Sequence, residues 1–239
     1  MARVAIIGAS IGGLPAAYEA RALLDKKHTV TVISNVSSFH FVPSNPWVAV
    51  GWRTRKDISF ELAPVLAKKG IEFVHATADR IEPEQNRVVT AKGEVSYDYL
   101  IIATGPKLNF AAVPGLGPSG HTQSVCNVDH AEQAWGAYQS FLKDPGPVVI
   151  GAAQGASCFG PAYEMAFILD TDLRKKKLRK KVPIYFVTPE PYIGHMGLAG
   201  VGKSRRLMED EFAEHSIKPI HNSAIKEVQP GKMLLEDGQ

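Results

Sequence analysis

Residues 4–13 read VAIIGASIGG, an unbroken apolar run that ends in a glycine-rich turn. Consecutive apolar residues, as at 4–7, are typical of a parallel strand that is buried on both faces. A helix is expected over residues 14–24, with Pro15 in the first turn, where a helix accepts proline. Residues 28–34 read HTVTVIS and form the next expected strand. This order of strand, glycine turn, helix and strand predicts a βαβ unit.

The glycine turn has the residue types that bind a dinucleotide. The fingerprint of such sites places glycine at its first, third and sixth positions. Here GASIGG has glycine at the first and sixth positions, serine at the third and an additional glycine at the fifth. Serine still lets the backbone approach a pyrophosphate, and the free N–H groups of the following helix favour an anion. The predicted contacts are Gly8, Ala9, Ser10, Ile11, Gly12 and Gly13.

The end of the second expected strand departs from the usual dinucleotide site. An acidic residue normally follows that strand and binds a ribose hydroxyl. Ser34 and Asn35 stand there instead, so a hydroxyl or an amide would hold the ribose. A tight turn without any ligand is the alternative, but the position of the turn between a strand and a helix disfavours it.

The opening pattern returns in the second half of the chain. A strand is expected over residues 147–150, a turn GAAQGA over 151–156, a helix over 156–173 and a strand over 182–188. Two βαβ beginnings in one chain indicate an internal duplication at the level of the fold.

Shorter elements are expected between and after these units. Residues 36–53 are rich in aromatics, serine and proline without a clean period, which predicts an ordered loop over a ligand. The other expected elements are helices at 58–69, at 129–142 with Asp129 as N-cap, and at 203–215; strands at 71–76, at 98–104 (buried) and near Ile217; an antiparallel meander at 79–95; irregular chain at 106–128; and a hairpin at 227–239 that is cut off, as in a fragment. The predicted domains are residues 1–110 and 145–239, with a connection at 111–144.

The charge balance gives little support to a nucleic-acid partner. The 239 residues include 27 Lys and Arg against 24 Asp and Glu, a net charge of +3. The run RKKKLRKK at 174–181 holds seven positive charges, and subtracting these seven from +3 leaves −4. Such a run is usually a solvated helix end, and contact with anionic lipid headgroups is the more specific alternative. The apolar content of 45% supports a folded core.

Neither a spanning helix nor a cleaved signal peptide is expected. The best candidate for a span, residues 148–169, contains Gln154, Ser157 and Glu164 and is not consistently apolar. The apolar run at the N-terminus is too short for the core of a signal peptide.

The segment YDYLIIATG at residues 97–105 resembles the second signature of flavoproteins with two dinucleotide-binding domains. Segments 39–52, 124–130, 155–164 and 190–197 resemble bacterial sulfide:quinone oxidoreductases. The resemblance covers the whole chain but only about the N-terminal half of the family's usual length. It implies an α/β fold of two Rossmann-like three-layer domains of the FAD/NAD(P)-binding type, both of them incomplete here. A third cysteine, a quinone pocket and amphipathic membrane helices belong to the other half of that family.

The resemblance also implies an activity: FAD-dependent oxidation of sulfide to polysulfide or sulfur, with the electrons passed to quinone. Sulfide and quinone are then the substrates, and the full-length protein is expected to be a peripheral membrane protein, with a homo-oligomer left open. The FAD contacts implied outside the glycine turn are Ser34, Asn35, Val42, Pro43, Thr77, Ala78, Ala103, Thr104 and Gly105.

Two cysteines cannot form a disulfide framework, but they can be redox centres. Cys158 is expected in the first turn of the second unit's helix, where the dipole and free N–H groups favour a thiolate. The resemblance makes Cys158 the catalytic cysteine and Cys126 an accessory one; a buried small hydrophobe and an idle loop thiol are the alternatives. Neither cysteine has a histidine at metal-binding spacing, so no metal site is predicted.

Three further residues complete the predicted catalytic set. The resemblance places His130 and His195 near the sulfide site, where an imidazole could take the proton released from HS⁻. A capping or surface histidine is the alternative, especially for His130 beside Asp129. Glu164 could be a buried proton acceptor or an internal salt-bridge partner.

Other functions remain open. A flavin subunit of flavocytochrome c sulfide dehydrogenase would use a haem partner as its acceptor. A type II NADH dehydrogenase would need a complete second glycine fingerprint, whereas Ala153 stands in the middle position and Cys158 at the helix start. Glu190 after the next strand could still imitate a ribose ligand. A non-catalytic FAD-binding fragment is the remaining alternative.

Overall fold

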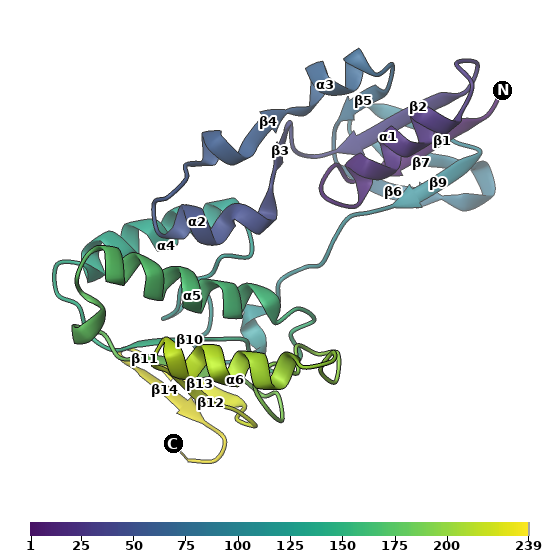
Figure 1. The fold of residues 1–239 in the computed structure, drawn as a ribbon. Coiled ribbons are helices and arrows are strands. Elements are labelled where there is room, and N and C mark those ends of the chain that lie inside the picture. Colours follow the sequence, from purple (N-terminus) through teal and green to yellow (C-terminus); the bar gives the residue numbers. More distant parts are fainter. Residues whose placement is uncertain (239) are drawn as a thin grey trace. The chain divides into compact units, whose positions relative to one another are not determined.

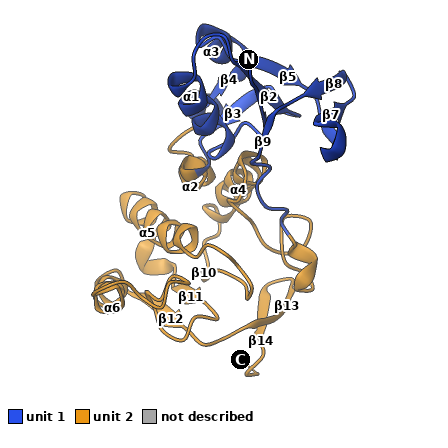
Figure 2. Cartoon of the chain, turned by 90° about the vertical axis from the view of Figure 1, so that its right-hand side faces the viewer, with its two compact units in different colours: residues 1–42, 55–108 blue, residues 43–54, 109–239 orange. Residues whose placement is uncertain are grey.

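The computed structural model describes residues 1–238 (Figure 1). The chain forms two compact units, coloured separately in Figure 2. Unit 1 contains residues 1–42 and 55–108, and unit 2 contains residues 43–54 and the chain from residue 109 onward. Each unit has its own sheet and its own hydrophobic core.

Unit 1 is built on a parallel sheet with the strand order β5-β2-β1-β9. Side chains alternate along β1, so the two faces of this sheet pack against different sets of residues. Val4 and Ile6 belong to a core with the helices α1 and α3, through residues such as Leu14 and Leu62. Ala5 and Ile7 belong to the opposite core, with Val88 of the meander. The elements are β1 (Arg3–Ile7), α1 (Gly13–Leu23), β2 (Thr29–Ser34), β3 (Ser38–His40), η2 (Arg55–Ile58), β4 (Ser59–Glu61), α3 (Leu62–Lys68), β5 (Glu72–His75), β6 (Ala78–Glu82), η3 (Pro83–Gln85), β7 (Arg87–Thr90), β8 (Gly93–Ser96) and β9 (Tyr99–Ile102).

Unit 2 repeats the pattern with a parallel sheet in the order β10-β11-β12. Phe186 of β11 and Phe212 of α6 are among its largest fully buried side chains. A second core joins Val187 to the hairpin β13-β14 through Ile225 and Val228. The elements are η1 (Val42–Ser44, which begins in unit 1), α2 (Asn45–Ala49), η4 (Phe110–Ala112), α4 (Val128–Phe141), β10 (Val148–Gly151), α5 (Gly160–Lys175), η5 (Arg179–Lys181), β11 (Ile184–Val187), α6 (Ser204–Glu214), β12 (Ile217–Ile220), β13 (Ile225–Gln229) and β14 (Lys232–Leu235).

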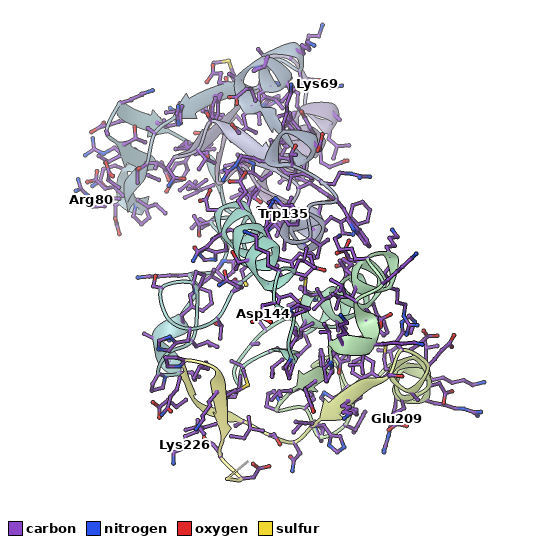
Figure 3. The ribbon with its side chains drawn as sticks, turned by 90° about the vertical axis from the view of Figure 1, so that its left-hand side faces the viewer. Lys69, Arg80, Trp135, Asp144, Glu209 and Lys226 are labelled. Atoms are coloured by element: carbon purple, nitrogen blue, oxygen red, sulfur yellow. The ribbon has the colours of Figure 1, made fainter. Side chains whose placement is uncertain are left out.

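Buried aspartates near the end of α5 hold unit 2 together. Asp172 accepts hydrogen bonds from the Trp52 indole at 2.8 Å and from the Tyr138 hydroxyl at 2.6 Å, so residues 43–54 are tied to α4 and α5. Trp135, labelled in Figure 3, lies on α4. Its ring is only 2.6 Å from the position that a Cβ at Gly51 would take. Dense contact of this kind explains why segment 43–54 belongs to unit 2.

Several expectations about elements were wrong. Residues 36–53 are not a loop, because they contain β3, η1 and α2. The helix expected over 58–69 begins only at Leu62, after η2 and β4. The hairpin near the end begins at Ile225 and pairs β13 with β14. The N-cap of α4 is Asn127, whose side chain accepts the N–H of His130, and not Asp129.

The strand β9 was expected to be buried and is largely exposed. It lies at the edge of its sheet, and Tyr99 and Ile102 are 66% and 61% exposed. Its apolar run was the reason for the expectation, but burial needs covering elements that no local pattern reveals.

The basic run 174–181 is partly used inside unit 2. Arg174 and Arg179 pair with buried Asp170, and Lys176 pairs with Asp172. Lys175 lies over the Trp52 ring at 4.3 Å. Much of this charge therefore stabilises the protein's own helix end. Within residues 1–238, no helix has both the length and the apolarity to cross a membrane.

Candidate functional site

Most of the predicted FAD contacts gather at one edge of the unit 1 sheet. The glycine turn follows β1, Ser34 ends β2 and Asn35 follows it, Thr77 follows β5, and Ala103 follows β9. All four strands are parallel, so these residues meet at the carboxyl ends, where open α/β sheets bind ligands. The hydrogen bonding between β1 and β2 extends to this edge, because the Gly8 N–H donates to the Ile33 carbonyl at 2.8 Å.

Close backbone contacts require the glycines of this turn. Gly8 has a φ of +105°, and a Cβ there would lie 2.2 Å from the Ala103 carbonyl oxygen. A Cβ at Gly13 would lie 1.9 Å from the Gly8 carbonyl oxygen. The turn is therefore folded against the Ala-Thr-Gly segment, with the start of α1 directly behind it. Such a backbone cradle at a helix N-terminus fits a pyrophosphate group.

The exposure of the predicted contacts varies. Ala9, Gly13 and Ser34 are buried, and the Ser34 hydroxyl accepts the N–H of Val36 at 3.3 Å. Val42 is the last residue of the first segment of unit 1, and Pro43 is the first of unit 2. The half-buried contacts are Gly8, Val42, Ala78 and Ala103; the exposed contacts are Ser10, Ile11, Gly12, Asn35, Pro43, Thr77, Thr104 and Gly105.

Both cysteines are free, exposed thiols in unit 2, and they occupy equivalent places. Cys126 directly precedes Asn127, the N-cap of α4, and Cys158 directly precedes Phe159, the N-cap of α5. The expectation that Cys158 lies within the first helical turn was wrong, because α5 begins at Gly160. Because Cys158 is exposed, it is also not the buried small hydrophobe that the alternative predicted. An exposed thiol beside free helix N–H groups is accessible to a sulfur substrate.

The two predicted histidines share an unusual feature. His130 and His195 each have a buried Nδ1 atom without a hydrogen-bond partner in residues 1–238. His130 lies in the first turn of α4, where its ring contacts Phe110 at a centroid distance of 5.6 Å. Because buried ring nitrogens are normally paired, these two atoms are available for a ligand or a proton.

The structure brings His195 close to the chain segment of Cys158. His195 lies in the turn between β11 and α6, and a Cβ at Gly197 would lie 3.5 Å from the Phe159 ring. Phe159 directly follows Cys158, so the two segments are in contact.

Glu164 differs from both expectations for it. It is exposed on α5, and it forms no ion pair within the described chain. Partial desolvation nonetheless raises the pKa of its carboxyl above the usual value. A carboxyl with a raised pKa exchanges protons closer to neutral pH.

The second glycine turn is tied to β13 by one of its own side chains. The Gln154 side chain donates to the Ile225 carbonyl at 2.8 Å and accepts the Ile225 N–H at 3.0 Å. Helix α5 begins nine residues after the end of β10, whereas α1 begins six residues after the end of β1. The expectation that Glu190 could imitate a ribose ligand was wrong, because this residue is 3% exposed and its carboxylate is bonded within the protein. The second turn therefore differs from the first in its length and in its ribose position.

Sequence reasoning missed Asn45. This side chain is fully buried, donates to the Val125 carbonyl at 3.0 Å and has an unpartnered Oδ1 in the described residues. It thus lies against the residue before Cys126. Nothing in the local sequence marked it, since Asn45 is eighty residues from Val125. In the part of the chain that the structure describes, no three His, Cys, Asp or Glu side chains group as metal ligands.

Residues 2–239 match the model of the pyridine nucleotide-disulphide oxidoreductases, and the chain belongs to this family. Its members are FAD-containing oxidoreductases. The predicted α/β fold of the FAD/NAD(P)-binding type is thereby confirmed.

Within the family, the resemblance to sulfide:quinone oxidoreductases is also confirmed. The sulfide-quinone reductase of Aquifex aeolicus is 47% identical over 236 residues, which are 98% of this chain and 54% of that protein. The crystal structure of the sulfide:quinone oxidoreductase from A. aeolicus superposes with a TM-score of 0.94 at 44% identity, over 100% of this chain and 56% of that one. The structure of NDH2 from Plasmodium falciparum, with a TM-score of 0.76 at 17% identity, covers 98% of this chain and 50% of its own and shows the fold alone. The chain spans about half the length of the curated relatives it matches.

Proposed function

We propose that the protein uses FAD to oxidise sulfide to polysulfide or sulfur and passes the electrons to quinone. The observation that carries this proposal is Cys158, an exposed free thiol next to the N-cap of α5. It lies in a unit whose glycine turn is tied to β13 by Gln154. The similarity to sulfide-quinone reductase supports the choice of substrates.

The carboxyl edge of the unit 1 sheet is the proposed FAD site. Residues 8–13 would bind the pyrophosphate through backbone N–H groups, since a closed glycine turn leaves no side chain in the way. Ser34 and Asn35 would face the ribose, and residues 103–105 would line the other side of the turn. When bound, FAD supplies a two-electron acceptor that quinone can reoxidise.

Cys158 is the proposed sulfur-holding nucleophile. Joining HS⁻ to the sulfur of Cys158 as a persulfide forms one S–S bond and releases one proton and two electrons, which FAD, when bound, would accept. His195 lies in a turn that contacts the segment of Cys158, and its unpartnered Nδ1 is a suitable acceptor for that proton. His130 and Cys126 share the start of α4 and are proposed as the accessory pair. Glu164 is proposed as an exposed proton exchanger.

Quinone as the acceptor implies a membrane surface, because quinones dissolve in lipid. We therefore propose that the full-length protein is peripheral to a membrane, without a nucleic-acid partner; a homo-oligomer is left open. The cations of run 174–181 that are not used in the pairs with Asp170 and Asp172 are candidates for lipid contact.

The test is sulfide-dependent reduction of a water-soluble quinone by the purified, flavin-loaded protein. Cys158→Ser should abolish this activity, since a hydroxyl cannot hold a persulfide. The variant should still bind FAD, because the glycine turn lies in unit 1. A Cys158→Ser protein with near-normal turnover would refute the assigned role.

NADH as the electron donor is the alternative that the curated NADH dehydrogenase-like relatives suggest, with 27% identity for one from Mycobacterium tuberculosis. The second turn argues against it, because Ala153 stands at its middle position and α5 begins nine residues after the end of β10. In a stopped-flow experiment, sulfide should bleach the flavin absorbance and NADH should not. The reverse result would favour an NADH dehydrogenase.

A further inference from the structure

Glu190 presents a buried carboxylate to three donors just after β11. Its Oε2 accepts hydrogen bonds from the hydroxyls of Tyr163 and Thr188, each at 2.8 Å. Its Oε1 accepts the backbone N–H of Met196. Since buried carboxylates are stable only when their oxygens are paired, these three donors keep Glu190 in place.

Tyr163 on α5 makes the second half of this arrangement. Its hydroxyl donates to Glu190 and accepts the N–H of Gly194 at 2.9 Å. The ring is fixed by aromatic packing, with centroids 4.5 Å from Phe186 and 5.7 Å from Phe212. A rigid side chain therefore holds the backbone at Gly194.

These two contacts flank a single residue, because Gly194 and Met196 are the neighbours of His195. Met196 has a φ of +53°, in the left-handed region that residues other than glycine adopt only at a cost in free energy. The hydrogen bond from the Met196 N–H to Glu190 helps to maintain this conformation.

The His195 ring is held by packing and by its backbone. Its Nδ1 is buried without a partner in the described chain. Its ring contacts Tyr192 edge-on at a centroid distance of 5.2 Å. Ser204 donates to the Gly194 carbonyl at 2.9 Å and the Leu198 N–H donates to the His195 carbonyl at 3.0 Å, so the carbonyl groups of this turn are bonded as well. Glu190 and Tyr163 add the side-chain hydrogen bonds to the N–H groups on both sides of His195.

We propose that Glu190 and Tyr163 are positioning residues that clamp the turn 194–196 and thereby fix the orientation of the His195 imidazole. This inference rests on the proposed sulfide oxidation for its catalytic consequence. The clamp itself is a property of the fold and can be measured without sulfide. It also gives the acidic residue at the expected ribose position a role inside unit 2.

The first test is amide hydrogen exchange in Tyr163→Phe and Glu190→Ala. Exchange at Gly194 should accelerate roughly tenfold or more in Tyr163→Phe, and exchange at Met196 should do so in Glu190→Ala. Tyr163→Phe keeps its ring packing, so it provides the test if Glu190→Ala fails to fold. The matched control is Tyr185→Phe on β11, whose hydroxyl has no hydrogen-bond partner within residues 1–238. Unchanged protection at both amides in folded variants would overturn the clamp.

The second test is steady-state kinetics of sulfide oxidation with the same variants. Misaligned His195 should lower kcat roughly tenfold or more in Tyr163→Phe while KM for sulfide and the FAD content stay near wild type. Lost protection with unchanged kcat would overturn the positioning role. If the wild-type protein does not oxidise sulfide, the proposed function fails, but the exchange result still decides whether the clamp exists.

Discussion

Gly8 illustrates how a single residue determines the predicted FAD site. Its positive φ and the Ala103 carbonyl, 2.2 Å from where a Cβ would be, both exclude a side chain. We expect Gly8→Ala to lower the free energy of unfolding of unit 1 by roughly 2 kcal/mol more than a glycine-to-alanine change at a positive-φ position without a nearby atom, because a backbone oxygen cannot move aside cheaply. Thermal unfolding followed by far-UV circular dichroism measures this.

Gly93 supplies the matched control. Its φ of +115° resembles that of Gly8, but no atom lies within 4 Å of its Cβ position. Gly93→Ala thus reports backbone strain without the clash. All three tryptophans, Trp47, Trp52 and Trp135, belong to unit 2, so their fluorescence should show an unchanged transition in both variants. Equal destabilisation by the two substitutions would contradict the proposed role of the Ala103 contact.

At the scale of elements, Asp170 joins the end of α5 to η5 and α6. It is fully buried and accepts hydrogen bonds from Arg174 at 2.7 Å, from His215 at 2.6 Å and from Arg179. Burial alone would raise the pKa of the Asp170 carboxyl, but these hydrogen bonds outweigh it and leave the pKa below its usual value. The ionised form is thus the form that stabilises unit 2.

A group with a depressed folded-state pKa stabilises the protein above its unfolded pKa, about 3.9 for aspartate, and this stability is lost as the pH falls through the folded value. Asp170→Asn should therefore cost unit 2 about 3 kcal/mol at pH 7, and this difference from wild type should shrink below about pH 4. Denaturant unfolding followed by tryptophan fluorescence measures both differences.

Asp144, exposed after α4, is the control for this prediction (Figure 3). Asp144→Asn should leave unfolding unchanged at either pH, because surface substitutions without special contacts have small effects. A cost of Asp170→Asn that is as large in acid as at pH 7 would show that the ionised carboxylate is not the source of the stability.

At the scale of the whole molecule, ligand binding should distinguish the two units. If FAD binds the native glycine turn of unit 1, it stabilises that unit by about 2.7 kcal/mol at one hundred times its Kd. The circular dichroism transition of the wild-type chain should then rise with FAD concentration. The same titration of Gly8→Ala should show a much smaller rise, while Gly93→Ala should behave as wild type. An equal rise in Gly8→Ala would place the FAD site elsewhere.

Local patterns were sufficient for the two βαβ units. The apolar run before Gly8 and the glycines of residues 8–13 predicted β1, the turn and α1, because strand burial and close backbone approach leave local marks. The meander over β6, β7 and β8 followed from alternation in the same way. The family and its FAD-containing fold were also evident from motifs, and the comparisons confirmed them.

Contacts between distant residues were decided only in three dimensions. Residues 43–54 belong to unit 2 because Trp52 bonds to Asp172, which is 120 residues away. From its place after a strand, Glu190 resembled a ribose ligand. Only the fold showed that its carboxylate accepts hydrogen bonds from the Tyr163 hydroxyl and the Met196 N–H. The sequence by itself determined the strands of the two parallel sheets and the glycine turn, since these depend on neighbouring residues. The tertiary structure decided which side chains are buried and which polar groups remain unpaired, because burial and hydrogen bonding depend on partners that the chain brings from far along its length.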